Sequence, residues 1–159
     1  LKLYIYFVIM LNDEWMKLAL LEARKAEINN EVPVGAILIN LQDSKIIEKS
    51  GNNMMSKSSP LAHAEIEIIT KSLKNLKRKY LENTAIYVTL EPCMMCAAAI
   101  SEARIKKVFF GAYDKKKGAY HNNDITNIKS YFKPEIYGGI MEKECSKIIR
   151  NFFKKIRLK

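Results

Sequence analysis

The sequence contains little cysteine and little histidine, with three cysteines and two histidines among its 159 residues. Three cysteines, an odd number, are too few to hold together a disulfide scaffold. No secretory cleavage pattern is visible either, so the chain is expected to be intracellular and reduced. A structural disulfide between Cys93 and Cys96 is therefore not expected. These two cysteines remain candidates for a redox pair, for part of a metal site, or for plain core.

The sequence also lacks an apolar run of the roughly 20 residues that a membrane-spanning helix needs. Residues 1–10 (LKLYIYFVIM) are apolar but too short, they lack a small-residue cleavage site, and the first methionine is Met10. We expect residues 1–9 to be a leader or a mis-called start, with an extra strand or an N-terminal arm as the alternative. Because no repeat, low-complexity segment or linker is present, residues 10–159 are expected to form one domain.

Acidic residues are scarce in the second half of the chain. Residues 1–70 hold 7 Lys/Arg and 9 Asp/Glu, a net charge of −2, whereas residues 71–159 hold 20 and 8, a net charge of +12. Such asymmetry indicates a polyanionic partner, with nucleic acid favoured over a membrane. A solvated, lysine-coated surface is the alternative explanation.

Apolar patterning predicts alternating helices and strands. Helices are expected at residues 12–27, 61–79, 93–104 and 141–157. Strands are expected at residues 32–40, 45–50, 84–90, 106–112 and 134–139. Asn12 is expected to cap the first helix. This alternation implies an α/β fold, a three-layer α/β/α sandwich around a mixed sheet of about five strands.

Cys93 and Cys96 follow the most continuous apolar strand and open a predicted helix, in the stretch TLEPCMMC (89–96). Residues i and i+3 share a helix face, so both sulfurs can point at one spot. Pro92 is tolerated at a helix start, and the partial positive charge there favours thiolates. Two thiolates at one point favour a bound cation, although C-x-x-C alone is equally compatible with redox chemistry.

His63 and Glu65 lie at the start of the helix that precedes the same strand, in PLAHAE (60–65). Positions two apart lie about 200° apart around a helix, so these two side chains do not share a side face. They can converge beyond the N-terminal end of the helix, where the C-x-x-C helix also begins if both start at one sheet edge. Two thiolates and one imidazole form a three-ligand zinc set that leaves the fourth position to water.

Taken singly, each of these residues has an ordinary explanation: a capping or core histidine, a solvent-exposed glutamate, and small core cysteines. Together, H-x-E followed by P-C-x-x-C resembles the signature of the zinc-dependent nucleobase deaminases. Deamination needs water to attack an electron-poor ring carbon, and zinc lowers the pKa of its water to about 7. A carboxylate close to the metal but not bound to it can move the protons, and Glu65 fits that role. Glu67 is expected to be exposed.

With this site, the sequence resembles the bacterial tRNA-specific adenosine deaminases of the cytidine deaminase-like superfamily, from about Asn12 to Arg157. The blocks that carry the resemblance are EVPVGA (31–36), G-x-N (51–53), LEPCMMC (90–96), S-x-x-R-I (101–105), G-A-x-D (111–114), and EC (144–145) followed by FF (152–153). The resemblance implies a cytidine deaminase-like fold and conversion of adenosine to inosine at the wobble position (34) of a tRNA anticodon. It also implies a cytoplasmic homodimer.

When the roles of the family's residues are carried over position by position, the resemblance implies that His63, Cys93 and Cys96 bind one Zn²⁺ per subunit. It implies that Glu65 is the proton shuttle.

The base site is carried over in the same way. Asn53 would hydrogen-bond the flipped adenine and Asp114 would shape the nucleotide pocket, while Val34 and Ala62 would line the base site. The sequence departs from the family pattern at two loop positions, Tyr113 and His121, where the family often has a basic residue and a small residue respectively.

The last predicted helix has a basic stripe that is separate from an apolar face. The stripe consists of Lys143, Lys147, Arg150, Lys154 and Arg157. The apolar face, expected to dock on the body, consists of Cys145, Ile148, Ile149, Phe152, Phe153 and Ile156. A basic stripe can follow a phosphate backbone. The expected contacts to the tRNA anticodon arm are Lys116, Lys117, Lys147, Arg150, Lys154 and Arg157.

Two alternatives stay open. The zinc motif by itself also fits deaminases of free bases or nucleotides, such as cytosine, cytidine, deoxycytidylate or guanine. A non-catalytic nucleic-acid-binding module with structural zinc is the other alternative. Such a module needs a fourth protein ligand, for which His121 and Cys145 are the spare candidates.

Overall fold

The computed structural model describes residues 2–121, 125–129 and 132–158, with only the backbone described for residues 2–11. The described residues form a five-stranded sheet in the order β2-β1-β3-β4-β5. Its strands are β1 (Gly35–Asn40), β2 (Ile46–Gly51), β3 (Thr84–Leu90), β4 (Lys107–Ala112) and β5 (Glu135–Tyr137). Strand β1 runs antiparallel to β2 and β3, whereas β3, β4 and β5 are parallel. The sheet is therefore mixed, as predicted.

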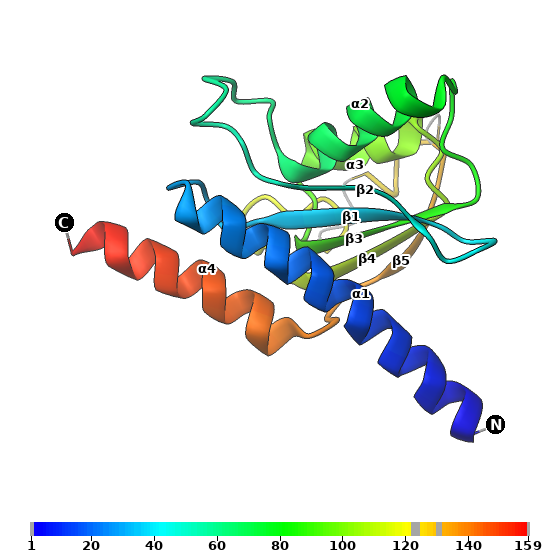
Figure 1. Ribbon diagram of the computed structural model, residues 1–159, viewed down its shortest axis with the longest axis horizontal. Coiled ribbons are helices and arrows are strands. Elements are labelled where there is room, and N and C mark those ends of the chain that lie inside the picture. The colour runs from blue at the N-terminus through cyan, green and yellow to red at the C-terminus, as the bar shows by residue number, and fades with distance from the viewer. Residues whose placement is uncertain (1, 122–124, 130–131, 159) are drawn as a thin grey trace.

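Helices cover both faces of the sheet (Figure 1). The helices are α1 (Lys2–Ile28), α2 (Ala64–Leu76), α3 (Met94–Glu102) and α4 (Glu142–Arg157). Alternate side chains of a strand point to opposite faces, so Leu38 packs in the core beneath α2 and α3 while Ile37 packs against α1 and α4. This arrangement confirms the three-layer α/β/α sandwich. Among the described helices, none is both long and apolar enough to span a membrane.

The expected N-cap at Asn12 is wrong, because α1 runs without a break from Lys2 to Ile28. No glycine or proline interrupts that stretch, so nothing in the backbone forces the helix to start late. The Asn12 side chain instead accepts a hydrogen bond of 2.7 Å from the Tyr87 hydroxyl on β3. The backbone of residues 2–9 is helical, which excludes the alternative of an extra strand there.

Two elements begin three residues later than the sequence pattern predicts. Strand β1 begins at Gly35 rather than at residue 32, because Pro33 has no N–H for sheet pairing and the register starts at Gly35 opposite Gly51. Helix α2 begins at Ala64 rather than at residue 61. A turn comes before it, in which the Ala62 N–H donates to the Ser59 carbonyl. His63 is thereby left as the N-cap of α2.

Gly35 is a point of close approach between α1 and β1. A Cβ added at Gly35 would lie 2.1 Å from the Ala19 carbonyl oxygen and 2.4 Å from the Ala23 nitrogen. Both are main-chain atoms of α1, so the helix as a whole must move to admit a methyl group. We expect Gly35→Ala to lower the free energy of unfolding by about 1–3 kcal/mol, measured by urea denaturation. The exposed turn variant Gln42→Ala should change it by less than about 0.5 kcal/mol; equal stability of the two variants would contradict the tight helix-to-strand contact.

Candidate metal and active site

One edge of the sheet gathers the chain segments that carry the predicted site. Strand β1 starts at this edge and β2, β3 and β4 end there, as shown by the pairing of Gly35 with Gly51 and of Leu90 with Ala112. A hydrogen bond of 3.1 Å from the Gly35 N–H to the Thr89 hydroxyl joins β1 to β3 at the same edge. Segments that are far apart in the sequence therefore meet where these strands begin or end.

Two helix N-termini converge at this edge and bring together three side chains that could hold a metal ion. His63 is the N-cap of α2, Cys93 is the N-cap of α3, and Cys96 lies in the first turn of α3. The His63 Nδ1 atom lies 3.7 Å from the Cys93 Sγ atom and 3.4 Å from the Cys96 Sγ atom. All three ligand atoms lie within 4.8 Å of one another. Both helices start at one sheet edge, which is the condition under which the sequence allows these residues to converge.

The spacing of these atoms fits a tetrahedral zinc ion. Zinc lies about 2.3 Å from a thiolate sulfur and about 2.0 Å from an imidazole nitrogen, which puts tetrahedral ligands about 3.5–3.8 Å apart. The donor set is soft, which favours zinc over magnesium or calcium. Within the described part of the chain, no fourth His, Cys, Asp or Glu joins this group. Cys145 packs on the other face of the sheet, and the exposed His121 ring packs edge-on against Tyr113, 5.6 Å between centroids.

Protonation of the two cysteines is strongly unequal. A hydrogen bond from the Cys96 thiol, helped by His63, lowers the pKa of Cys93 to about 4. The same hydrogen bond, together with burial and the nearby Glu65, raises the pKa of Cys96. The hydrogen bond to Cys93 raises the pKa of His63. These shifts favour a thiolate on Cys93, and a divalent cation held here would displace the remaining proton because metals bind the deprotonated sulfur.

Glu65 lies inside the protein, with 4% of its surface exposed. It is the second residue of α2, directly after Ala64. Burial, assisted by the nearby Cys93 and opposed by His63, raises its pKa to about 7. This carboxyl group can therefore hold or release a proton near neutral pH, as a general acid–base group must. The expectation that Glu67 is exposed is wrong: it is 8% exposed, and it pairs with Lys57 at 2.6 Å.

The four predicted base-site residues lie around the same edge. Val34 comes directly before β1 and is partly buried, and Asn53 follows β2. The Asn53 N–H donates a hydrogen bond of 2.9 Å to the Ala62 carbonyl, which ties the residue next to His63 to the end of β2. Asp114 follows β4, and its carboxylate accepts hydrogen bonds of 2.9 and 3.1 Å from the N–H groups of Lys116 and Lys117.

Sequence reasoning missed Tyr120, which lies in a stretch expected to be loop. Its side chain is buried. Burial raises the pKa of its hydroxyl, and the charges of Glu65 and Cys96 raise it further. A single tyrosine in a polar loop carries no periodicity, so no sequence signal could have identified it.

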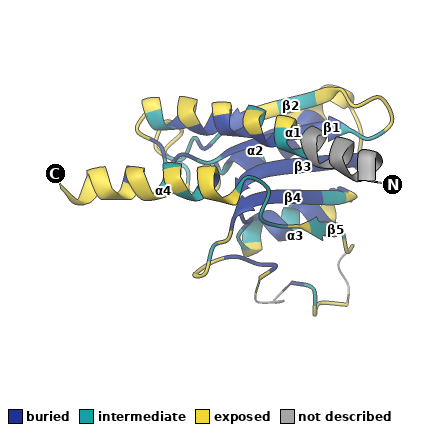
Figure 2. Cartoon of the chain, turned by 90° about the horizontal axis from the view of Figure 1, so that it is seen from below, coloured by how far each residue is buried: buried dark blue, intermediate teal, exposed yellow. Residues whose placement is uncertain are grey.

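Helix α4 docks on the body through only part of its predicted apolar face. Cys145 and Phe152 are buried, but Phe153 and Ile156 are 40% and 52% exposed. The expectation that the whole apolar face docks is wrong, because the last turns extend beyond the sheet, on the side where the site lies (Figures 1 and 2). A 2.9 Å ion pair between Lys155 and Glu27 joins this part of α4 to the end of α1.

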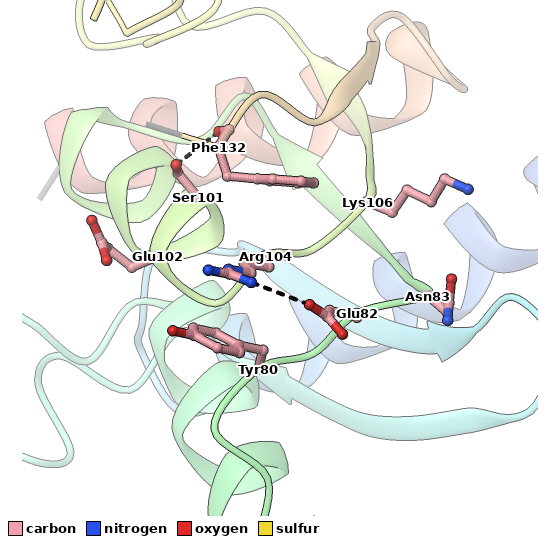
Figure 3. A pocket seen from close by; sticks show the side chains of 8 residues that line it. All are labelled: Tyr80, Glu82, Asn83, Ser101, Glu102, Arg104, Lys106 and Phe132. Carbon is pink, nitrogen blue, oxygen red and sulfur yellow. Dashed lines mark hydrogen bonds and ion pairs between the residues drawn. The ribbon is translucent and has the colours of Figure 1, made fainter. Parts of the chain in front are cut away.

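A hollow of about 500 Å³ lies at the opposite edge of the sheet, where β3 and β4 begin, and Figure 3 shows the side chains that line it. Its lining includes Tyr80, Arg104 and Phe132. The Arg104 guanidinium lies 3.9 Å from the centre of the Tyr80 ring and 3.4 Å from the Glu82 carboxylate. Its charge is thereby already partnered, and the hollow shares no residue with the candidate site.

Comparisons with known proteins agree with this geometry. The family model of the MafB19-like deaminases matches residues 10–157. The chain is 46% identical over 144 residues to a tRNA-specific adenosine deaminase of Rickettsia bellii, covering 89% of this chain and 99% of that one. It is 39% identical over 153 residues to a tRNA-specific adenosine deaminase of Bacillus subtilis, covering 94% of both chains.

Solved structures have the same fold. One, from a study of A-to-I editing by tRNA:A34 deaminases at the wobble position of transfer RNA, superposes with a TM-score of 0.81 at 41% identity, covering 85% of this chain and 98% of that one. A guanine deaminase from Nitrosomonas europaea shares the fold at 15% identity, with a TM-score of 0.76, covering 88% of this chain and 83% of that one. The ligand geometry, the family match and the extent of identity lead to one conclusion: the chain belongs to the family of tRNA-specific adenosine deaminases.

Proposed function

We propose that this protein is a zinc-dependent enzyme that hydrolyses adenosine to inosine at the wobble position of a tRNA anticodon. The observation that carries the proposal is the meeting of His63, Cys93 and Cys96, with ligand atoms within 4.8 Å of one another, beside the buried Glu65. The chain that builds this site is 46% identical to a tRNA-specific adenosine deaminase.

His63, Cys93 and Cys96 would hold one Zn²⁺ per subunit. When bound, the ion acts as a Lewis acid that activates water at neutral pH. The positive ends of α2 and α3 point at the same place and help to keep the sulfurs ionised. The two thiolates offset the charge of the ion, so that little net charge remains at a partly buried position.

Glu65 would move the protons of the reaction. Its carboxylate takes a proton from the attacking water and delivers it to the N1 atom of the adenine ring. It then takes the second proton from the hydroxyl group now on C6 and passes it to the amino group, which leaves as ammonia while the oxygen stays on C6 as a carbonyl. A pKa of about 7 suits a group that must both accept and donate a proton at neutral pH.

The substrate base would lie between the loops at this sheet edge. Asn53 would hydrogen-bond the flipped adenine, and Asp114 would shape the pocket around the nucleotide. Val34 and Ala62 would provide apolar contacts to the base. Flipping is required because the target atom is otherwise out of reach, and a base in an unpaired anticodon loop is flipped at low cost.

The RNA backbone would contact exposed basic residues around the same edge. These are Lys116, Lys117, Lys147, Arg150, Lys154 and Arg157, all of which are exposed. Three of them, Arg150, Lys154 and Arg157, line one shallow hollow on the projecting end of α4 together with Leu158. A row of cations on a projecting helix can neutralise successive phosphates, which makes binding salt-dependent.

The protein would act as a homodimer in the cytoplasm, where its tRNA substrate is found. Support for self-association comes from three apolar side chains near the start of the ligand-bearing helices. Met55, Leu61 and Met94 are 74%, 58% and 40% exposed. Large exposed apolar side chains near a site are candidates for burial against a partner.

The decisive test is a deamination assay with the purified protein. An anticodon stem-loop with wobble adenosine is compared with free adenosine, cytidine and guanine, and Glu65→Ala is the inactive control. We expect inosine in the stem-loop only, and none with the control. Turnover of a free base or nucleoside with the stem-loop untouched would assign the protein to the small-molecule deaminases. Zinc binding without any turnover would instead indicate the non-catalytic zinc module.

A further inference from the structure

Two buried carboxylates next to the site have no part in the chemistry described above. Glu31 has 0% of its surface exposed and Glu91 has 2%. Glu31 comes directly before the segment that enters β1, and Glu91 directly follows β3, two residues before Cys93. Burial of an ionised carboxylate is costly unless hydrogen bonds replace the lost water, so the partners of each group indicate what it holds in place.

Glu31 is surrounded by donors from the loop that follows β2. Its Oε1 atom accepts hydrogen bonds from the Ser56 N–H at 2.7 Å and the Ser56 hydroxyl at 2.9 Å. Its Oε2 atom accepts from the Met55 N–H at 3.0 Å and from the Asn52 side-chain amide at 3.3 Å. Asn53 lies between these anchored residues. Burial would raise the pKa of Glu31, but the hydrogen bonds outweigh it and hold that pKa below its ordinary value.

Glu91 holds the loop that follows β4 in the same way. Its Oε2 atom accepts a hydrogen bond of 3.0 Å from the N–H of Asp114. Its Oε1 atom accepts from the N–H groups of Tyr120, at 3.0 Å, and His121. Gly118 lies so close that an added Cβ would be 2.2 Å from the Glu91 Oε2 atom. The loop that carries Asp114 therefore folds around a single carboxylate.

We propose that Glu31 and Glu91 are positioning residues that set the places of Asn53 and Asp114, respectively, against the substrate nucleotide. This inference rests on the proposed function. An ionised carboxylate only accepts hydrogen bonds, and breaking one of these bonds leaves a buried charge unsatisfied. Each loop is therefore held in one position before RNA arrives, and a misplacement of about 1 Å can cost about a hundredfold in rate.

The test uses Glu31→Gln and Glu91→Gln, with Glu22→Gln as the matched control. Glu22 is also buried, at 8% exposed, but its partners are the surface residues Lys25 and Lys49. In each test variant, the new amide places an NH₂ group against backbone donors. We expect kcat/KM for the stem-loop to fall by about tenfold to a hundredfold, mainly through KM, with one zinc per chain retained. The kcat/KM of the Glu22→Gln control should stay within about twofold of that of the parent protein.

Double-mutant cycles separate positioning from a general loss of structure. When Asn53→Ala is already present, adding Glu31→Gln should lower kcat/KM by less than about twofold, because the Asn53 side chain that Glu31 positions is then gone. The same is expected for Glu91→Gln added to Asp114→Ala. In the crossed pairs, Glu31→Gln with Asp114→Ala and Glu91→Gln with Asn53→Ala, the two losses of kcat/KM should multiply. Multiplying losses in the matched pairs would overturn the proposal, as would no effect of Asn53→Ala or Asp114→Ala alone.

Hydrogen exchange on the RNA-free protein tests the same tethers without any activity. Residues 54–57 should exchange faster in Glu31→Gln, and residues 113–121 in Glu91→Gln, while β3 is unchanged in both. Unchanged exchange overturns the inference even if the stem-loop is deaminated. Faster exchange in a protein that does not deaminate the stem-loop refutes the proposed function and leaves the tethers standing.

Milder variants cover the case in which a glutamine variant does not fold. Ser56→Ala removes one hydrogen bond to Glu31 and leaves its charge in place, and Glu91→Asp keeps the charge but draws the oxygens back by one methylene. Both should show the same local exchange and the same coupling as the glutamine variants, with smaller losses. Wild-type exchange in these variants would overturn the proposal.

Discussion

Replacing Glu65 by glutamine is expected to lower kcat for wobble-adenosine deamination by about 10²- to 10⁴-fold, the usual contribution of general acid–base catalysis. Glutamine has nearly the same shape, so the packing around α2 should survive, but an amide cannot carry a proton from water to the ring. The variant should still bind one zinc per chain, because Glu65 is not among the ligands that meet at His63. The measurements are single-turnover deamination and metal content.

Glu67→Gln is the matched control for this prediction. Glu67 lies two residues further along α2 and is also largely buried, at 8% exposed, but it pairs with Lys57 at 2.6 Å instead of facing the metal ligands. It should keep kcat within a few fold of the parent and lose only stability. If Glu65→Gln lost no more activity than Glu67→Gln, another group would have to be the proton shuttle.

Removing the metal with a chelator is expected to abolish deamination completely, and one equivalent of Zn²⁺ should restore it. Mg²⁺ should not restore activity, because thiolate and imidazole ligands favour soft cations. The metal-free protein should also be less stable. An ion that binds only the folded state at a thousand times its dissociation constant stabilises that state by about 4 kcal/mol. Thermal unfolding and metal analysis of the two forms check both effects.

Two cysteine variants test whether this loss is specific to the site. Cys96→Ala should lose the metal and all activity, because only two of the three protein ligands, His63 and Cys93, would remain. Cys145→Ala is the control: it is equally buried, but it packs on the other face of the sheet, against Gly111. It should keep one zinc per chain and its activity. Full activity in the metal-free protein, or in Cys96→Ala, would contradict a catalytic metal.

The ligand set could be predicted from the sequence because the residue types themselves carry the signal. Cys93 and Cys96 are three apart at a helix start, and His63 stands before another helix, so one sheet edge can gather all three. The alternation of strands and helices also predicted the layered fold. Two of the errors, at Asn12 and Glu67, share one cause: the two residues looked like a cap and a surface residue. Each makes its decisive contact with a distant residue, Tyr87 and Lys57 respectively.

By itself, the sequence determined the chemistry: two thiolates, an imidazole and a carboxylate, on elements whose order places them at one edge of the sheet. Only the tertiary structure decided how the loops around that site are held. Glu31 and Glu91 bind mainly backbone N–H groups, and every residue except proline has such a group. A side chain whose partners are main-chain atoms leaves no complementary residue in the sequence, so its role appears only when the chain is folded.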